Sequence, residues 1–367
     1  MARLMNFNAG PAALPRAALE RAQSELLELG KAGASVLEIS HRGKEFEAIH
    51  HETIERLRRL AGIDDSWAVL LVQGGASQQF AQIPMAFLGA GKTAAYAVTG
   101  VWGEKAVQEA ERTAKLLGGT VTTALTTKEW GTYHRAARAG EVVASDDVTY
   151  VHTTSNGTIH GLQQHVAPYA GKAPHVCDMS SDFLWKKTDF SPYSFVYAGA
   201  QKNIGPSGIV IVMAKKSFLE TMRGDLPKIF DYRNILENDS LYNTPPTFSV
   251  YLARNVLAWV EEQGGVVALE QRNREKAALV YGALDAGGGF YDLPVERASR
   301  STMNVVFRMT TTELEEKFLG EAKAAGMIGL KGHRSVGGMR ASLYNAVEVG
   351  WAKALADLIT DFAKKNG

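Results

Sequence analysis

Short apolar runs that stop at glycine, each followed by a helical segment, form the pattern that most restricts the fold of this chain. Residues 67–75 read WAVLLVQGG and precede a helical pattern over 77–88, and residues 93–100 read TAAYAVTG and precede one over 102–119. Apolar strands that alternate with helices predict an α/β fold, with a mostly parallel central sheet sandwiched by helices. Ligands of such sheets bind at the carboxyl ends of the strands. Four further apolar runs, at residues 147–157, 175–183, 195–203 and 208–216, extend the pattern.

The two ends of the chain differ from this central pattern. Amphipathic helical spacing covers residues 15–33 and 44–62, and both segments end in glycine, as a helix with a glycine cap does. Toward the other end, two long helical patterns lead into a region where shorter strand-like and helical segments alternate. We therefore expect a large domain over residues 16–260, and a smaller α+β domain formed by residues 1–15 and 261–367.

The composition favours a protein that binds small molecules. The formal net charge is +1, from 40 basic and 39 acidic residues, so no charge excess favours nucleic acid or a membrane surface as a partner. No run reaches the roughly 18 apolar residues of a membrane span, and we find no apolar signal segment. The one cysteine, Cys177, excludes an internal disulfide. We expect a cytoplasmic protein in which Cys177 is part of the core.

Two of the predicted strands end in groups that can carry out chemistry. Asp178 ends the strand in PHVCD, and Lys202 follows the strand in FVYA, 24 residues later. Because both stand at strand ends of one sheet, we expect them to face one site. The turn QGGAS at residues 73–77 precedes a helix, where free backbone N–H groups can bind a phosphate. Trp102, after a third strand, can stack on a planar ligand.

An amine, a carboxylate, a phosphate-binding turn and a flat aromatic ring are the groups needed to hold pyridoxal phosphate. The lysine forms an imine with the cofactor's aldehyde, and the carboxylate keeps the pyridine nitrogen protonated so that the ring can accept electrons. A dinucleotide site is the competing interpretation. It fails because the turn lacks the third glycine of the G-x-G-x-x-G pattern.

Several motifs, in order along nearly the whole chain, carry a resemblance to a known family. They read FNAGPAALP, SVLEISHRGKEF, QGGASQQF, TGVWGEKA, GAQKNIGPSG, YNTPPTF and HRSVGGMRASLYNA. In these motifs the chain resembles the phosphoserine aminotransferases, class V aminotransferases of the aspartate-aminotransferase-like superfamily. The resemblance implies fold type I of the pyridoxal-phosphate-dependent transferases and a homodimer with shared active sites.

The resemblance assigns roles to individual residues of the cofactor site. Lys202 matches the lysine that forms the Schiff base, and Asp178 matches the partner of the pyridine nitrogen. Trp102 matches the ring that stacks on the cofactor, and Thr158 matches the threonine that contacts its ring hydroxyl. The phosphate contacts implied are Ala76, Ser77 and Gln201 from one subunit, with Asn243 and Thr244 from the neighbouring subunit.

Two positions depart from the family pattern. Gly157 stands where the family usually has a glutamate, which leaves the geometry of the turn before Thr158 open. Ser77 stands where some members have an arginine, so one substrate contact of those members is absent here.

The resemblance also implies a reaction, the transfer of an amino group between L-glutamate and 3-phosphohydroxypyruvate to give O-phospho-L-serine and 2-oxoglutarate. Both amino acids carry an α-carboxylate and a second anion, and arginine suits both through bidentate contacts. Arg340 matches the arginine that holds the α-carboxylate. His333 matches part of the cluster that receives the second anion, with His41 and Arg42 coming across the dimer interface. Arg334 is a further candidate for substrate binding.

The sequence leaves alternatives open. An alanine- or serine-glyoxylate-type aminotransferase shares the fold and needs no second anion site. A non-catalytic regulator that binds pyridoxal phosphate belongs to another class of protein, and no DNA-binding segment favours it. Use of 4-phosphohydroxythreonine in pyridoxine biosynthesis is also left open.

Overall fold

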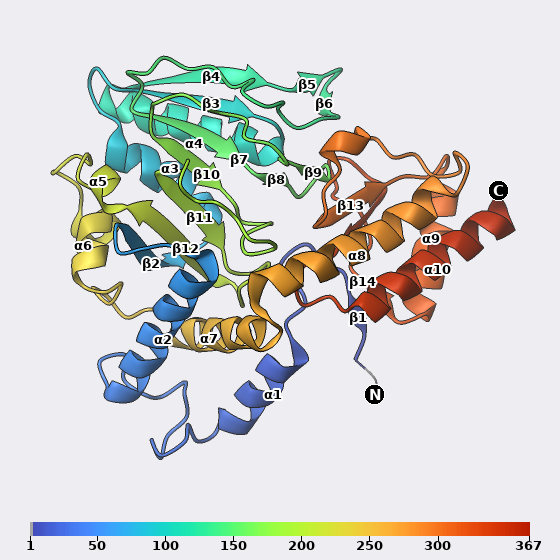
Figure 1. Ribbon diagram of the computed structural model, residues 1–367, viewed down its shortest axis with the longest axis horizontal. Coiled ribbons are helices and arrows are strands. Elements are labelled where there is room, and N and C mark those ends of the chain that lie inside the picture. Colours follow the sequence, from blue (N-terminus) through green and yellow to red (C-terminus); the bar gives the residue numbers. More distant parts are fainter. Residues whose placement is uncertain (1–2) are drawn as a thin grey trace.

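A computed structural model describes residues 3–367 and contains one large central sheet (Figure 1). Seven strands form it in the order β2-β12-β11-β10-β7-β3-β4. Neighbouring strands are parallel except where β12 is involved, because β12 runs antiparallel to both β11 and β2. The architecture therefore confirms the predicted α/β class with a mostly parallel sheet. In sheet order the strands are β2 (Trp67–Gly74), β12 (Gly208–Lys215), β11 (Phe195–Gly199), β10 (His175–Asp178), β7 (Tyr150–Thr154), β3 (Thr93–Val98) and β4 (Thr120–Thr126).

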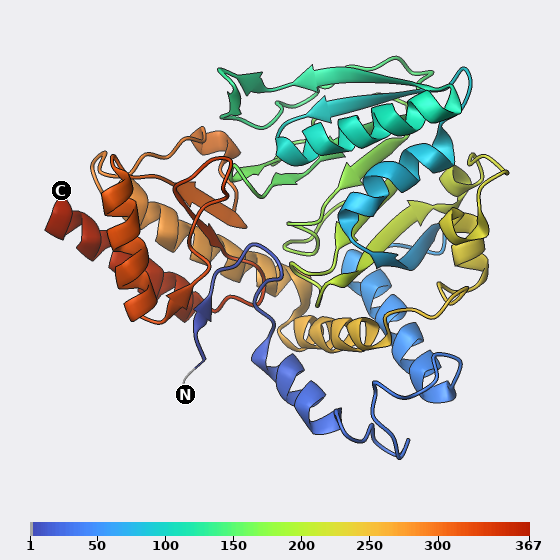
Figure 2. The same ribbon diagram turned by 180° about the vertical axis from the view of Figure 1, so that it is seen from behind.

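Helices cover both faces of this sheet. The helices α3 (Ala76–Phe87) and α4 (Val101–Leu117) lie on the face that is seen in Figure 2. Three helices cover the other face, and short elements flank β12 and β2. Side chains of each strand alternate between the two cores, so Val176 of β10 packs on the α3 side and Cys177 on the opposite side. The remaining helices of this part are α1 (Arg16–Glu25), α2 (Lys44–Ala61), α7 (Thr247–Glu262), α5 (Lys216–Leu219), α6 (Tyr232–Glu237) and the 3-10 helix η1 (Lys228–Phe230).

The first predicted helix is shorter than its sequence pattern. The helix α1 ends at Glu25 and does not continue to residue 33. Gly30 and Gly33 have left-handed φ values of 52° and 66° within a segment of turns, so neither glycine caps the helix. The second segment agrees with its prediction, because Gly62 caps α2 with a φ of 67°.

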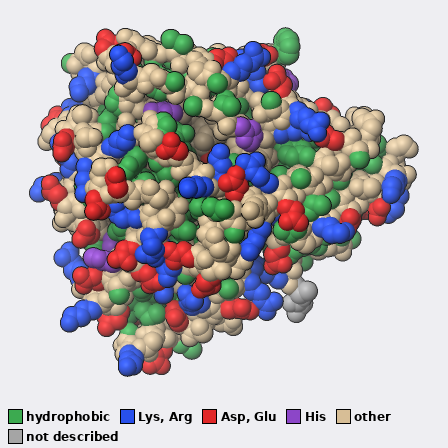
Figure 3. Space-filling view, viewed as in Figure 1, with side chains coloured by type: hydrophobic (Ala, Val, Ile, Leu, Met, Phe, Trp, Pro, Cys, Tyr) green, Lys and Arg blue, Asp and Glu red, His purple; other side chains and the backbone are tan. Residues whose placement is uncertain are grey.

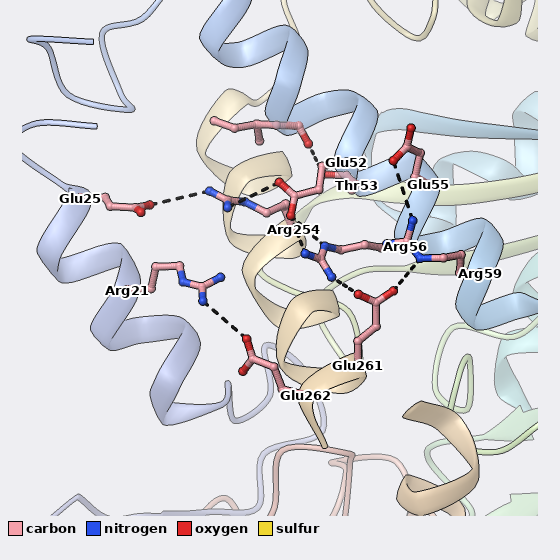
Figure 4. A network of polar contacts seen from close by, with 11 residues as sticks. Arg21, Glu25, Glu52, Thr53, Glu55, Arg56, Arg59, Arg254, Glu261 and Glu262 are labelled. Atoms are coloured by element: carbon pink, nitrogen blue, oxygen red, sulfur yellow. Dashed lines mark hydrogen bonds and ion pairs between the residues drawn. The ribbon is translucent and has the colours of Figure 1, made fainter. Parts of the chain in front are cut away.

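A network of ion pairs ties α1 and α2 to α7 (Figure 4). Arg254 of α7 lies between Glu25 of α1 and Glu52 of α2, with N–O distances of 3.7 and 3.6 Å. The Tyr251 hydroxyl, one turn earlier on α7, donates to Glu25 at 2.5 Å. Further along α7, Glu261 pairs with two arginines of α2. The network ties α1 to α7, and Ala18 and Ala22 of α1 pack in the same core.

A second core lies on the C-terminal side of the molecule, at the right in Figure 1. The helix α8 (Gly265–Asp285) leads into it from α7, and β13 (Asn304–Phe307) pairs antiparallel with β15 (Met339–Ser342). The N-terminal strand β1 (Met5–Asn6) pairs with β14 (Met327–Ile328), so the start of the chain packs with its end. We propose that residues 16–260 form the large domain and that residues 1–15 and 261–367 form the small one. The other elements are α9 (Thr312–Ala324), α10 (Val349–Asn366), β5 (Lys128–Glu129), β6 (Thr132–Tyr133), β8 (Asn156–Gly157), β9 (Leu162–Gln163) and the 3-10 helix η2 (Arg297–Ser299).

The surface carries basic and acidic side chains in a mixed pattern on the face seen in Figure 3, in keeping with the net charge of +1. No helix within residues 3–367 is long and apolar enough to cross a membrane. Cys177 is buried, as the sequence predicts.

Candidate active site

One cavity at the carboxyl ends of β10 and β11 brings together most of the predicted cofactor residues. The two strands are parallel neighbours, with Asp178 opposite Tyr197, so both chains leave the sheet at the same edge. Asp178 and Lys202 therefore reach one cavity although 24 residues separate them in the sequence. The predicted residues that line this cavity are Ala76, Ser77, Trp102, Thr158, Asp178, Gln201 and Lys202.

Lys202 places its amine inside the cavity. Its Nζ donates a hydrogen bond to Thr158 Oγ1 at 3.0 Å and lies 5.8 Å from the centroid of the Trp102 ring. Burial lowers the pKa of Lys202 to about 8, with the Asp178 charge acting in the opposite direction. A lysine with this pKa is partly neutral near pH 7 to 8, as a nucleophile or general base must be.

Asp178 is a buried carboxylate whose Oδ1 accepts a hydrogen bond from the backbone N–H of Ser180 at 2.9 Å. Burial raises the pKa of Asp178, and within residues 3–367 no basic side chain forms an ion pair with it. A buried carboxylate without a cation is costly. The protonated nitrogen of a pyridine ring would supply that cation, so Asp178 fits pyridoxal phosphate.

The start of α3 forms one end of the cavity. This helix begins at Ala76, and the residue before it, Gly75, provides no side-chain cap. The N–H of Gln78 donates to the Gly75 carbonyl at 2.9 Å, whereas the N–H groups of Ala76 and Ser77 have no partner among the described residues and can bind an anion. The indole N–H of Trp102 is buried without a hydrogen-bond partner in the described residues, a second polar group in this cavity that a ligand can satisfy.

Arg340 brings a basic side chain next to the cavity, because it contacts the backbone of the lining residue Thr158. Arg340, on β15, donates from Nη1 to the backbone carbonyl of Thr158 at 3.4 Å. Burial lowers the pKa of Arg340, and its Nε has no partner among the described residues. His333 and Arg334 lie in the segment before β15. Within residues 3–367 none of these three side chains forms an ion pair with a carboxylate, so together they can receive an anion.

The other four predicted residues lie outside this cavity in the single chain. Asn243 donates from Nδ2 to Gln73 Oε1 at 2.7 Å and lines a separate hollow of about 160 Å³. Thr244 follows it in the same loop. His41 and Arg42 lie in the turn before α2 and do not line the cavity. Their predicted place at a neighbouring subunit's site stays a prediction.

The departure at Gly157 leaves the adjacent hairpin intact. Gly157 is in β8, which pairs with β9 so that it stands opposite Leu162. Its φ is not in the left-handed region, and a Cβ added there would lie 3.5 Å from Leu162 Cβ, an ordinary contact. The backbone at this position would thus accept a side chain.

Sequence reasoning missed the polar residues Asn156, Ser180 and Ser181, which also line the cavity. Asn156 donates to Ser181 Oγ at 2.8 Å, and Ser180 Oγ accepts from the N–H of Gly199 at 3.1 Å. The Asp178–Ser180 bond has a sequence signal, because an aspartate commonly accepts from the amide two residues on. The other contacts join distant segments and have no such signal. The remaining lining residues are Gly75, Phe80 and Gly199.

Comparison with known proteins places the chain in a family. Residues 4–350 match the class-V aminotransferases. The chain is 48% identical over 365 residues to a phosphoserine aminotransferase of Geobacillus kaustophilus (strain HTA426), an alignment that covers 100% of this chain and 99% of the relative. It is 47% identical over 368 residues to the phosphoserine aminotransferase of Bacillus subtilis (strain 168), with 100% of both chains covered.

Solved structures agree with this assignment. The phosphoserine aminotransferase from Bacillus circulans subsp. alkalophilus has a TM-score of 0.94 and 45% identity, covering 100% of this chain and 99% of that one. A phosphoserine aminotransferase from Trichomonas vaginalis with bound pyridoxal phosphate has a TM-score of 0.90 and 36% identity, covering 97% and 99%.

The fold and the cavity define a pyridoxal-phosphate-dependent aminotransferase, and the chain belongs to the class-V aminotransferase family. Within that family, it is similar over its full length to phosphoserine aminotransferases. An alanine–glyoxylate aminotransferase from Nostoc sp., at 16% identity and a TM-score of 0.74, shares the fold alone.

Proposed function

We propose that this protein is a phosphoserine aminotransferase, which transfers an amino group between L-glutamate and 3-phosphohydroxypyruvate to give O-phospho-L-serine and 2-oxoglutarate. The reaction is a step of serine biosynthesis. The observation that carries the proposal is a cavity that contains an amine of lowered pKa and a buried carboxylate, with Arg340 donating to the backbone carbonyl of Thr158, one of its lining residues, at 3.4 Å. Such a cavity suits an amino acid with two anionic groups.

Each residue of the cavity has a task in this reaction. Bound pyridoxal phosphate supplies an electron sink that stabilises negative charge at the α-carbon of the substrate. The N–H groups at the start of α3 would hold the cofactor phosphate, and Asp178 would pair with the pyridine nitrogen. Lys202 Nζ would hold the cofactor's aldehyde carbon, and as a free amine it would take the proton from the substrate's α-carbon and later return one. Trp102, which lines the cavity, would stack on the cofactor ring.

The substrate anions divide between two sets of basic groups. Arg340 binds the α-carboxylate that every amino acid carries. His333, with Arg334 beside it, binds the phosphate of phosphoserine or the side-chain carboxylate of glutamate. This division distinguishes the proposal from an alanine–glyoxylate-type enzyme, whose substrates have no second anion.

We further propose a homodimer that shares its active sites. His41, Arg42, Asn243 and Thr244 lie outside the cavity of their own chain. A second copy would bring Asn243 and Thr244 to the cofactor phosphate and His41 and Arg42 to the second anion. We also propose a cytoplasmic location, which the single buried thiol of Cys177 favours.

Substrate half-reactions test the function directly. We expect phosphoserine and glutamate to convert the enzyme-bound cofactor rapidly, and serine and alanine to do so slowly, as followed by the visible absorbance. For the reaction with phosphoserine, Arg42→Ala should reduce transition-state stabilisation by on the order of 2–5 kcal/mol. This is the usual effect of removing one partner of a buried charge pair. Equal rates for serine and phosphoserine would overturn the phosphoserine assignment and leave the aminotransferase standing.

A further inference from the structure

Lys105 lies at the edge of the active site and has no assigned role. It follows Trp102 by three residues on α4, so the two side chains share one side of the helix. Its Nζ lies 4.6 Å from the centroid of the Trp102 ring, a cation–π distance. The side chain is exposed, and within residues 3–367 no carboxylate pairs with it. The adjacent Glu104 is engaged elsewhere, by Lys128 Nζ and the Tyr133 hydroxyl at 2.7 Å each.

The charge of Lys105 acts on His333. Burial lowers the pKa of His333, and the charges of Arg340, Arg334 and Lys105 lower it further. No acidic side chain is among the groups that act on this imidazole. The cations that act on His333 thus come from α4 as well as from the segment around β15, and Trp102, on whose ring Lys105 rests, lines the cavity that contains Lys202. Unneutralised cations from two elements around one point form a site for an anion.

The Trp102 ring fixes where the Lys105 ammonium stands relative to the reacting groups. Lys202 Nζ also lies near this ring, 5.8 Å from its centroid. One indole therefore contacts both the amine inside the cavity and the amine at its edge. A flexible lysine side chain that rests on an aromatic face is held in fewer conformations than one in open solvent.

We propose that Lys105 is a specificity-determining residue whose ammonium binds the side-chain anion of the substrate together with His333. This role rests on the proposed function, because it requires a substrate with a second anion. A phosphate monoester carries about 1.5–2 negative charges at pH 7, against one for a carboxylate. The Coulomb attraction between Lys105 and the substrate side chain is therefore stronger for phosphoserine than for glutamate. Alanine has no side-chain anion, so Lys105 does not attract its side chain.

Kinetics of Lys105→Met, with Lys115→Met as the matched control, test this role. Lys115 is an exposed lysine in the last turn of the same helix, far along α4 from Trp102. In Lys105→Met we expect kcat/KM to fall about tenfold or more for phosphoserine, the effect of losing one charged hydrogen bond, with a smaller fall for glutamate and none of that size for alanine. Lys105→Arg should restore kcat/KM for phosphoserine. Lys115→Met should have the wild-type kcat/KM for all three substrates.

A titration that does not depend on turnover gives a second readout. In the holoenzyme, NMR of the His333 ring should show a higher pKa in Lys105→Met than in the wild type, because one of the charges that lower it is gone. Inorganic phosphate should perturb the His333 signal at lower concentration in the wild type than in the variant. An unchanged His333 titration together with unchanged phosphoserine kinetics overturns the role of Lys105.

The outcomes separate this role from the function on which it rests. A wild type that prefers phosphoserine to serine, with a Lys105→Met variant that keeps the full preference, refutes only the role of Lys105. An equal loss for alanine and phosphoserine also refutes it, because Lys105 would then act on the site as a whole. A wild type with no preference for phosphoserine refutes both proposals.

Discussion

The reactivity of Lys202 is set by its surroundings. Burial disfavours the ammonium form, and the positive charge of Arg340 acts in the same direction. The charge of Asp178 opposes both, but the net effect is a pKa of about 8, lowered from the ordinary value of 10.5. The neutral amine is the form that attacks an aldehyde. Lowering the pKa increases the fraction of neutral amine near pH 7.

This pKa predicts the pH dependence of labelling in protein freed of its cofactor. Pulse acylation followed by peptide mapping should modify Lys202 half-maximally near pH 8, because acylation requires the neutral amine. Reactivity should rise with pH through that value. A midpoint near 10.5 would contradict the account, since it would show that the cavity leaves this amine unperturbed.

At the scale of elements, the helices α1, α2 and α7 depend on the ion-pair network of Figure 4. The Arg254 side chain is 14% exposed and contacts carboxylates of two other helices. Arg254→Met should destabilise the protein by about 1.5–2 kcal/mol, because Glu25 loses its cation while Glu52 keeps Arg56. Thermal unfolding followed by circular dichroism should show a lower Tm.

The control is an exposed pair on the same part of the molecule. Arg16 and Glu20 pair within α1 with side chains that are 73% and 57% exposed, so Arg16→Met should change stability by less than about 1 kcal/mol. Equal Tm values for the two variants would show that the network contributes no more than surface pairs do.

At the scale of the whole molecule, the sequence predicts the features of the fold that a local residue pattern encodes. Asp178 and Lys202 follow apolar runs, so their meeting at one sheet edge could be predicted from strand ends alone. The direction of β12 could not, because a strand buried on both faces is apolar throughout and carries no sign of whether its neighbours are parallel. The early end of α1 could not either, since its apolar spacing continues past Glu25 into a segment of turns.

The site shows the same limit. The residues that line the cofactor cavity include those that stand at strand ends or helix starts, which a sequence reveals. Asn156 and Ser181 reach the cavity through contacts between distant segments, which only the folded chain brings together. Residues that reach the site of a second copy are harder still to predict, because no spacing within one sequence shows which residues cross an interface.

The central claim is that two copies complete one site, with Lys202 from one chain and Arg42 from the other. A hybrid dimer of Lys202→Ala and Arg42→Ala chains, purified through two different tags and assayed with phosphoserine, tests it most directly. Each parent homodimer should be nearly inactive. The hybrid should recover about half of the wild-type activity, because one of its two sites then contains both residues. A hybrid as inactive as its parents would contradict the account, since it would place Lys202 and Arg42 of the same chain in one site.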